Sequence, residues 1–161
     1  MRDLIICDNF YSNVDEVRDY ALKQDFNVDG NYPGHRTKSF LNDNIAEWIS
    51  KIVGAEMDTE TLGDDTYCGA YQYTTAKDRT WIHADGWNHW AGVVYLTPDA
   101  PASGGTGIFR HKPTGSYSMP RLADGSRNET LAELINNDGQ DYTKWELIDQ
   151  VGNKYNLSLI H

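Results

Sequence analysis

The sequence predicts an α+β fold in which helices pack on one side of an antiparallel sheet sandwich or barrel. The two clearest helical periodicities lie in the first third of the chain, and short strand-like segments follow from residue 66 onward. With 161 residues, the chain can bury a core without disulfides. Because no repeat, low-complexity tract or long linker interrupts it, we expect a single domain over residues 1–161.

The N-terminal region predicts one strand and two helices. The apolar residues 4–7 are typical of a short buried strand, and a first helix is expected to begin after Ser12, which can cap it. A loop is expected over the Pro- and Gly-containing residues 30–36. The second helix is clearer, because apolar residues recur at i, i+3, i+4, i+7 and i+8 over residues 45–53 and Gly54 follows them.

The rest of the chain consists of short segments rich in β-branched and aromatic residues, separated by polar or Gly- and Pro-rich turns. The expected strands are residues 66–74, 80–85, 91–97, 107–110, 145–148 and 156–160. Residues 98–105 form the clearest break, and a loop-rich insert over 113–128 precedes a short helix at 129–135. We expect a ligand site at the mouth of the barrel that these strands would form.

Composition limits the partners and the compartment. The formal net charge of −10 argues against nucleic-acid binding, which needs Lys and Arg to neutralise phosphates, and we interpret the acidity as solubility. Cys7 and Cys68 form no CxxC motif, so we expect buried free thiols, which suit a reducing cytoplasm. No apolar run is long enough for a signal peptide or a membrane span, which predicts a cytoplasmic protein.

The triplet His83-Ala84-Asp85 is the strongest chemical signal. On a strand, residues two apart point to the same face, so an imidazole and a carboxylate would project side by side. These are two of the three ligands of a 2-His-1-carboxylate iron site, which leaves coordination positions open. Such a short triplet also occurs by chance, so the surrounding sequence must show whether it belongs to a metal site.

Several residues are candidates for binding a carboxylate of a substrate or co-substrate. Tyr71 and Tyr73 alternate on one strand face, where their hydroxyls could donate to a co-substrate carboxylate or simply pack in the core. Arg110, Lys112 and Arg36 are the basic candidates, and an Arg suits bidentate contact. If Arg110 faces solvent, its anchoring role disappears.

Other residues near the triplet are candidates for contacting a substrate. His111 competes for the position of third metal ligand, but an edge-strand histidine with a hydrogen bond or a substrate contact explains it equally. Trp81, Trp87 and Trp90 flank the triplet and could line a hydrophobic mouth or pack around a small barrel. We assign His89 to a loop.

Four motifs in order resemble the core of the 2-oxoglutarate/Fe(II)-dependent oxygenases, most closely the prolyl-hydroxylase-like branch and its uncharacterised relatives. The motifs are Tyr71-Gln72-Tyr73, His83-Ala84-Asp85, Val94-Tyr95-Leu96-Thr97 and Gly104-Gly105-Thr106-Gly107-Ile108-Phe109. Weaker similarity at residues 8–11 and 32–34 extends the resemblance over most of the chain. Each motif is common, and their order and spacing make the set specific.

The resemblance implies a double-stranded β-helix (a jelly roll) with the N-terminal helices packed on one sheet. It implies Fe(II) held by His83, Asp85 and a distal histidine, and 2-oxoglutarate bound to the iron and to a basic residue on a later strand. His161, the last residue, is the candidate for the distal ligand. No later strand with a basic anchor follows it here, so the resemblance implies a C-terminally truncated version of the fold or a site assembled differently.

The expected function is that of a 2-oxoglutarate/Fe(II)-dependent dioxygenase, an oxidoreductase that hydroxylates a small-molecule or peptide substrate. The alternative is a non-catalytic or metal-incomplete β-barrel binding module derived from the same fold. A cupin-type metal enzyme ranks behind both, because the chain lacks a cluster of two close histidines and a Glu. A serine hydrolase finds no support, since no Gly-x-Ser-x-Gly is present.

Overall fold

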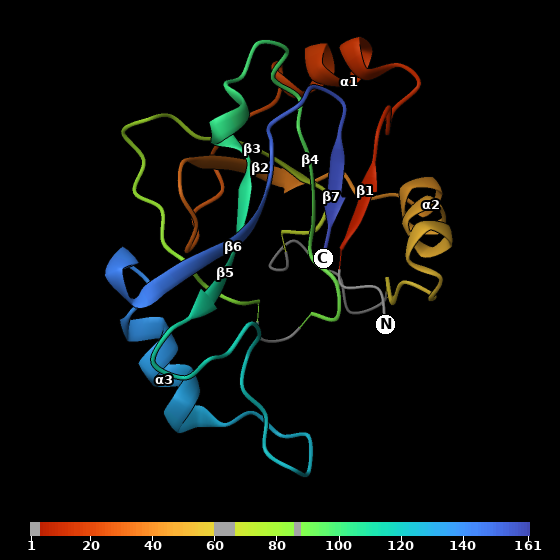
Figure 1. The fold of residues 1–161 in the computed structure, drawn as a ribbon. Coiled ribbons are helices and arrows are strands. Elements are labelled where there is room, and N and C mark those ends of the chain that lie inside the picture. Colours follow the sequence, from red (N-terminus) through yellow and green to blue (C-terminus); the bar gives the residue numbers. More distant parts are fainter. Residues whose placement is uncertain (1–3, 60–66, 86–87) are drawn as a thin grey trace. The chain divides into compact units, whose positions relative to one another are not determined.

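The computed structural model describes residues 4–59, 67–85 and 88–161, and Figure 1 gives the order of the elements. Its contacts divide the chain into two compact units. The larger unit comprises Met1–Val14 with Trp81–His161, and the smaller unit comprises Asp15–Thr80. The segment before the first helix therefore packs in the same unit as the C-terminal half of the chain.

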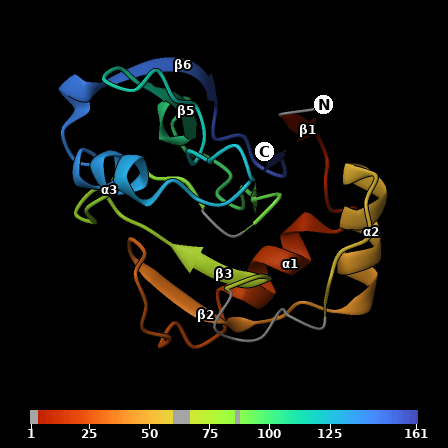
Figure 2. The ribbon, with the colours of Figure 1, turned by 90° about the horizontal axis from the view of Figure 1, so that it is seen from below.

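The smaller unit contains a two-stranded antiparallel sheet of β2 (His35–Ser39) and β3 (Ala70–Tyr73). The two strands lie side by side in Figure 2. Helix α1 (Val14–Ala21) contributes Tyr20, whose ring contacts Phe40 edge-on at 5.5 Å between centroids. These aromatic contacts supply apolar burial that the short, polar strand β2 cannot supply by itself.

Helix α2 (Asp43–Val53) has a defined cap at each end. The side chain of Asn42 accepts a hydrogen bond from the Ile45 N–H, which satisfies one of the free donors of the first turn. Gly54 ends the helix with φ of 75°, a left-handed conformation that glycine adopts without a Cβ clash. The helix predicted from the apolar spacing is confirmed.

The larger unit contains a three-stranded antiparallel sheet in the order β1 (Ile5–Cys7), β7 (Ser158–Ile160), β4 (Gly92–Val94). Figure 1 shows β7 between the other two strands. All three residues of β7 are buried, and Leu159 is fully buried. The centre of this sheet is thus formed by the last strand of the chain, which has a neighbour on each side.

Asn156 fastens the segment after β1 to the segment before β7. Its side chain accepts a hydrogen bond from the Tyr11 N–H and donates one to the Tyr11 carbonyl, both at 2.8 Å. Its main-chain carbonyl accepts from the Phe10 N–H at 3.0 Å. The residue is buried and has φ of 61°, a left-handed conformation that Asn tolerates better than most residues.

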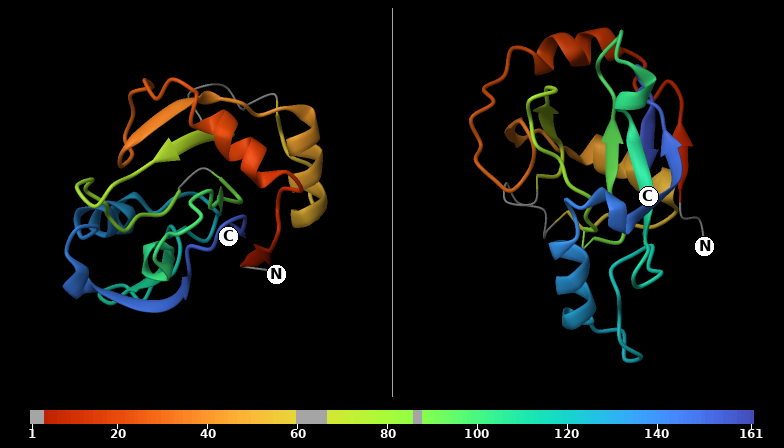
Figure 3. Two further views of the ribbon diagram at one scale, coloured as in Figure 1. Left: turned by 90° about the horizontal axis from the view of Figure 1, so that it is seen from above. Right: turned by 60° about the vertical axis from the view of Figure 1, so that its left-hand side comes forward.

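A second sheet of the larger unit pairs β5 (Thr106–His111) with β6 (Trp145–Val151) in antiparallel register. The two strands run beside each other in Figure 3, and an irregularity in their register lies between Ile108 and Phe109. Helix α3 (Glu129–Asn137) lies between them in the chain and is capped by Asn128, which accepts from the Leu131 N–H. The predicted helix at 129–135 is confirmed.

The α+β class is therefore confirmed, with three helices and small antiparallel sheets among the described residues. The sheets contain three, two and two strands, and no closed barrel or jelly roll is present in the described ranges. Two local expectations were wrong. Residues 35–39 form a strand where the loop over 30–36 was expected to end, and residues 81–85 do not form a strand.

Both errors have a physical reason. The sequence of β2, His-Arg-Thr-Lys-Ser, has no apolar alternation, and its strand conformation follows from pairing with β3. Residues 81–85 have apolar character but no ladder partner in the structure. Strand formation requires such a partner, and a local pattern cannot guarantee one.

Other expectations concern the cysteines and the membrane. Cys7 and Cys68 are free and half-buried, and burial raises the pKa of the Cys68 thiol above its ordinary value. Within the described part of the chain, no helix has the length and apolar character needed to cross a bilayer.

Candidate metal centre

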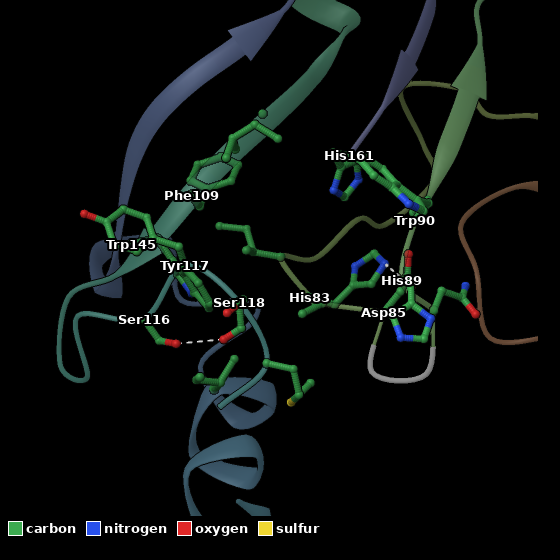
Figure 4. Close-up of a pocket in the computed structure, with 18 residues that line it drawn as sticks. His83, Asp85, His89, Trp90, Phe109, Ser116, Tyr117, Ser118, Trp145 and His161 are labelled. Atoms are coloured by element: carbon green, nitrogen blue, oxygen red, sulfur yellow. Dashed lines mark hydrogen bonds and ion pairs between the residues drawn. The ribbon is translucent and has the colours of Figure 1, made fainter. Parts of the chain in front are cut away.

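A pocket of about 240 Å³ lies in the larger unit and contains the His83–Asp85 pair. Its lining comes from residues 82–85 and 88–91, β5, the loop 116–119, α3, β6 and the last residue of the chain. Figure 4 shows two walls: His83, Asp85, His89 and His161 lie on one side, and Phe109, Tyr117 and Trp145 on the other.

His83 and Asp85 lie close enough to act together. The Nε2 atom of His83 is 3.8 Å from Oδ1 of Asp85, and the two side chains are 49% and 47% exposed. The Nδ1 atom of His83 is 3.2 Å from the carbonyl oxygen of Trp81. A carbonyl only accepts, so this contact favours a proton on Nδ1, and a neutral ring then presents the Nε2 lone pair, as is common in metal-binding histidines.

The segment that contains His83 and Asp85 is not part of a sheet, and it is held by a contact with the residues that follow α3. The Ile82 N–H donates a hydrogen bond to the Gly139 carbonyl at 2.8 Å. A Cβ on Gly139 would lie 2.6 Å from the Ile82 carbonyl oxygen, so this close approach requires glycine. The Trp81 ring lies 5.5 Å from that of His83, which further restricts the imidazole.

His161 enters the same pocket from the sheet. Its main-chain N–H donates to the Ala91 carbonyl at 2.9 Å, and its carbonyl accepts from the Ala91 N–H at 2.8 Å. These two bonds continue the pairing of β4 with β7 to the last residue, so the backbone of His161 is held in place. Its side chain lines the pocket (Figure 4).

His89 is a pocket residue that the sequence interpretation assigned only to a loop. The sequence signal for a pocket position was that His89 follows Asp85 by only four residues. A loop has no fixed periodicity, however, so the sequence could not show in which direction the His89 side chain points. Across the described residues, no group of three or more His, Cys, Asp or Glu side chains is close enough together to hold a metal ion. The pocket therefore contains a two-residue donor pair, with two further histidines in its lining.

The comparison with protein families matches residues 1–157 to the profile of a family of unknown function, DUF6445. The chain belongs to this family. No curated protein and no solved structure matches it significantly. The DUF6445 match covers both units and includes His83 and Asp85.

In this DUF6445 chain, Arg110 is paired with groups of the protein itself. Its guanidinium pairs with the carboxylate of Glu146, its register partner on β6, and donates to the Tyr117 hydroxyl at 3.5 Å. The hydrogen bond to Glu146 raises the pKa of Arg110. The residues of the larger unit that line the pocket include no Lys or Arg. Arg110 thus already has a carboxylate partner within the protein, and its role toward a co-substrate stays a prediction.

His111 lies behind the pocket wall and is not among the residues that line the pocket. The residue is fully buried, with Nε2 at 3.0 Å from Asp138 Oδ2 and Nδ1 at 3.0 Å from Thr114 Oγ1. Both ring nitrogens thus have partners within the protein, an arrangement that matches the expected histidine with a hydrogen bond, and its substrate role stays a prediction. Its ring packs on that of Trp145, with 4.7 Å between the centroids. Trp145 lines the pocket, so His111 supports the pocket wall from the side away from the cavity.

The two tyrosines expected to bind a co-substrate belong to the smaller unit. Tyr71 packs against Phe40 with 5.4 Å between ring centroids, and burial raises the pKa of its hydroxyl. Tyr73 stacks on His35 at 5.0 Å. Both side chains thus have packing partners, and their role toward a co-substrate stays a prediction.

Arg36 also belongs to the smaller unit. Its guanidinium lies over the rings of Tyr32 and Tyr67, at 4.2 and 4.8 Å from their centroids, and donates to the Gln72 side chain. Such stacking stabilises the cation in place. Trp87, the remaining candidate for substrate contact, lies outside the described residues.

Proposed function

We propose that the chain is an Fe(II)- and 2-oxoglutarate-dependent oxygenase that hydroxylates a small-molecule or peptide substrate. The observation that carries the proposal is the 3.8 Å separation of His83 Nε2 and Asp85 Oδ1 in a pocket that His161 also lines. The free Nε2 lone pair and the carboxylate are suitable donors for Fe(II). The ordered resemblance to the oxygenases supports the same assignment.

The chain's own residues have three tasks in this proposal. His83 and Asp85 supply two ligands, and the Trp81 carbonyl keeps the His83 ring in the tautomer that can bind metal. His161 is the candidate for the third ligand, because its backbone is held at the end of β7 beside the pocket. Aromatic side chains opposite these ligands would form the apolar side of the site, next to the reacting group.

The bound iron would supply oxidation by O₂, with 2-oxoglutarate providing two electrons and the substrate C–H bond the other two. One oxygen atom enters the succinate that is formed together with CO₂, and the other enters the hydroxylated product. This balance requires no further reductant. It makes succinate, CO₂ and product appear in equal amounts.

The proposal includes a double-stranded β-helix as the finer description of the larger unit. Supporting it, the pocket is lined from two sheets: His161 follows β7 in one, and Phe109 and Trp145 belong to the other. Ligand sites between the sheets of a barrel-like fold are expected in this architecture.

A binding module without catalysis is the second candidate, and two observations favour it. No three potential ligands lie within metal-binding distance of one another among the described residues. The pocket lining in the larger unit also offers no Lys or Arg to a dicarboxylate co-substrate. Under this alternative the pocket would bind a ligand without oxidising it.

Titration calorimetry with Mn(II), a redox-stable substitute for Fe(II), tests the metal site. We expect one ion per chain, and His83→Ala or Asp85→Ala should weaken binding at least about tenfold, because each removes a donor. His161→Ala tests the third ligand. His35→Ala removes an exposed histidine that stacks on Tyr73, and its Mn(II) affinity should equal that of the wild type. Unchanged affinity in His83→Ala would contradict the proposal.

The co-substrate requires a separate measurement. Binding of 2-oxoglutarate to the Mn(II)-loaded protein, and its loss when the metal is removed with EDTA, is the result expected of the oxygenase. Metal binding without any 2-oxoglutarate binding would favour the binding module. Mixing Fe(II), 2-oxoglutarate and candidate substrates and measuring succinate then identifies turnover.

A further inference from the structure

We propose that the pocket binds its substrate through an uncharged, apolar group about the size of one aromatic ring. The identification of this pocket as the substrate site rests on the function proposed above. The nature of the bound group follows from the wall opposite His83 and Asp85, which is largely apolar and preformed and which, among the described residues that line the pocket, contains no Lys or Arg.

The apolar wall is built from buried side chains of three segments. Met119, Ile135 and Trp145 are 9%, 3% and 8% exposed and come from the loop after β5, from α3 and from β6. The ring of Phe109 extends this wall along β5 (Figure 4). A Cβ on Gly107 would lie 2.6 Å from that ring, so the glycine provides the space in which Phe109 lies.

A buried polar network fixes the wall from behind. The Trp145 Nε1–H donates to the Asp138 carbonyl at 2.9 Å, and the His111 ring packs on the same indole. The side chain of Asp138 in turn binds His111 at 3.0 Å. The wall therefore needs no rearrangement to receive a ligand, which lowers the entropic cost of binding.

The charges around the pocket disfavour an anionic group. Among the lining residues of the larger unit, Asp85 is acidic and no Lys or Arg is present. Arg110, which lies on β5 next to Phe109, is neutralised by Glu146. A carboxylate or phosphate pressed against Phe109 and Trp145 would lose its hydration without gaining a cationic partner. A metal ion bound to Asp85 would neutralise its carboxylate. A cationic group in the pocket would then have no anionic partner among the described lining residues either.

The volume sets the size of the bound group. An apolar cavity of about 150 Å³ accommodates a benzene molecule. At about 240 Å³, this pocket has room for one ring with a small substituent, and its opening to solvent leaves the remainder of a larger substrate outside. An aromatic or compact aliphatic group fits both the size and the chemistry of the wall.

Three isosteric probes that differ only in charge test this proposal: p-toluamide (neutral), p-toluate (anionic) and p-toluamidine (cationic). Their dissociation constants are measured by ligand-observed NMR on metal-free protein, so that the carboxylate cannot bind a metal. We expect p-toluamide to bind at least about tenfold more tightly than p-toluate. The series is repeated on Asp85→Asn, in which repulsion or attraction by the Asp85 carboxylate is removed and the preference for the neutral probe should persist.

Two variants locate the binding site. Ser118 is exposed and lines the pocket, so Ser118→Trp should fill it and abolish p-toluamide binding, and Phe109→Ala should weaken binding at least about tenfold by removing part of the wall. Ser103→Trp, at an exposed position outside the lining, is the matched control and should bind like the wild type. Equal or tighter binding of p-toluate or p-toluamidine in Asp85→Asn would overturn the proposal, as would full binding in both pocket variants.

Measurements on the same proteins separate this proposal from the metal site. Phe109→Ala, on the wall opposite the donor pair, should keep the Mn(II) affinity of the wild type while it weakens p-toluamide binding, and Ser103→Trp should keep both affinities. Probe binding in a wild-type protein that fails to bind Mn(II) would overturn the oxygenase and leave the apolar pocket supported. Mn(II) binding without probe binding would overturn the apolar pocket and leave the oxygenase standing.

Discussion

His111 Nε2 lies 3.0 Å from Asp138 Oδ2 and joins the end of β5 to the residue that follows α3. A carboxylate accepts and does not donate, so the ring proton is on Nε2. His111 is fully buried, and its ring supports Trp145 in the pocket wall. A polar pair behind the pocket thus determines where an apolar pocket residue lies.

Replacing this histidine should destabilise the protein. We expect His111→Ala to lower the free energy of unfolding by about 2–4 kcal/mol, because it leaves a cavity beside Trp145 and removes the partner of Asp138. Urea denaturation followed by tryptophan fluorescence measures the change. His35→Ala, at an exposed position, should change stability by less than about 0.5 kcal/mol. Equal stability of the two variants would contradict the structural role of His111.

Asn156 should be sensitive both to its side chain and to its backbone conformation. We expect Asn156→Ala to lower the unfolding free energy by about 1–3 kcal/mol, since it removes two hydrogen bonds to Tyr11 and places a Cβ-bearing residue without local polar contacts at φ of 61°. Asn156→Gly loses the same hydrogen bonds but tolerates this φ, so it should be about 1 kcal/mol more stable than Asn156→Ala. Thermal melts of the three proteins check the order.

Gly139 should influence the metal site without contacting a metal. A Cβ on Gly139 would lie 2.6 Å from the Ile82 carbonyl oxygen, so Gly139→Ala must displace the segment that leads to His83. We expect Mn(II) affinity to fall by about tenfold or more, because ligand geometry tolerates little displacement. Gly104→Ala is the control, since a Cβ there would have no neighbour closer than 3.8 Å and the residue is not in the left-handed conformation. Equal Mn(II) affinity in the two variants would show that the 82–139 contact does not position the pair.

The Cys68 thiol should react slowly in the folded protein. Burial raises its pKa, so at pH 8 it contains less thiolate than an exposed cysteine, and thiolate is the reactive form. In a Cys7→Ser background, we expect iodoacetamide to alkylate Cys68 at least several-fold more slowly in buffer than in urea. The difference should narrow as the pH rises through the elevated pKa and the folded thiol ionises. Identical rates in buffer and urea at pH 8 would contradict the burial of Cys68.

The apolar spacing over residues 45–53, followed by Gly54, was sufficient to predict helix α2. Its signals are local: the periodicity places one face toward a core, and the caps satisfy the free groups at the ends. Strand β2 could not be predicted in the same way, because its polar residues acquire their conformation from hydrogen bonds to β3, more than thirty residues later.

The sequence by itself determined the α+β class and the main helices, because these depend on near neighbours along the chain. The approach of His83 to Asp85 was not determined in this way, because their segment is not a strand and is held by the hydrogen bond between Ile82 and Gly139.

Only the tertiary structure decided that Arg110 pairs with the carboxylate of Glu146 and that the buried His111 binds the carboxylate of Asp138. These contacts join residues 36 and 27 positions apart. Such contacts form when strands and helices pack, and a one-dimensional pattern does not specify which partner a charged side chain will find.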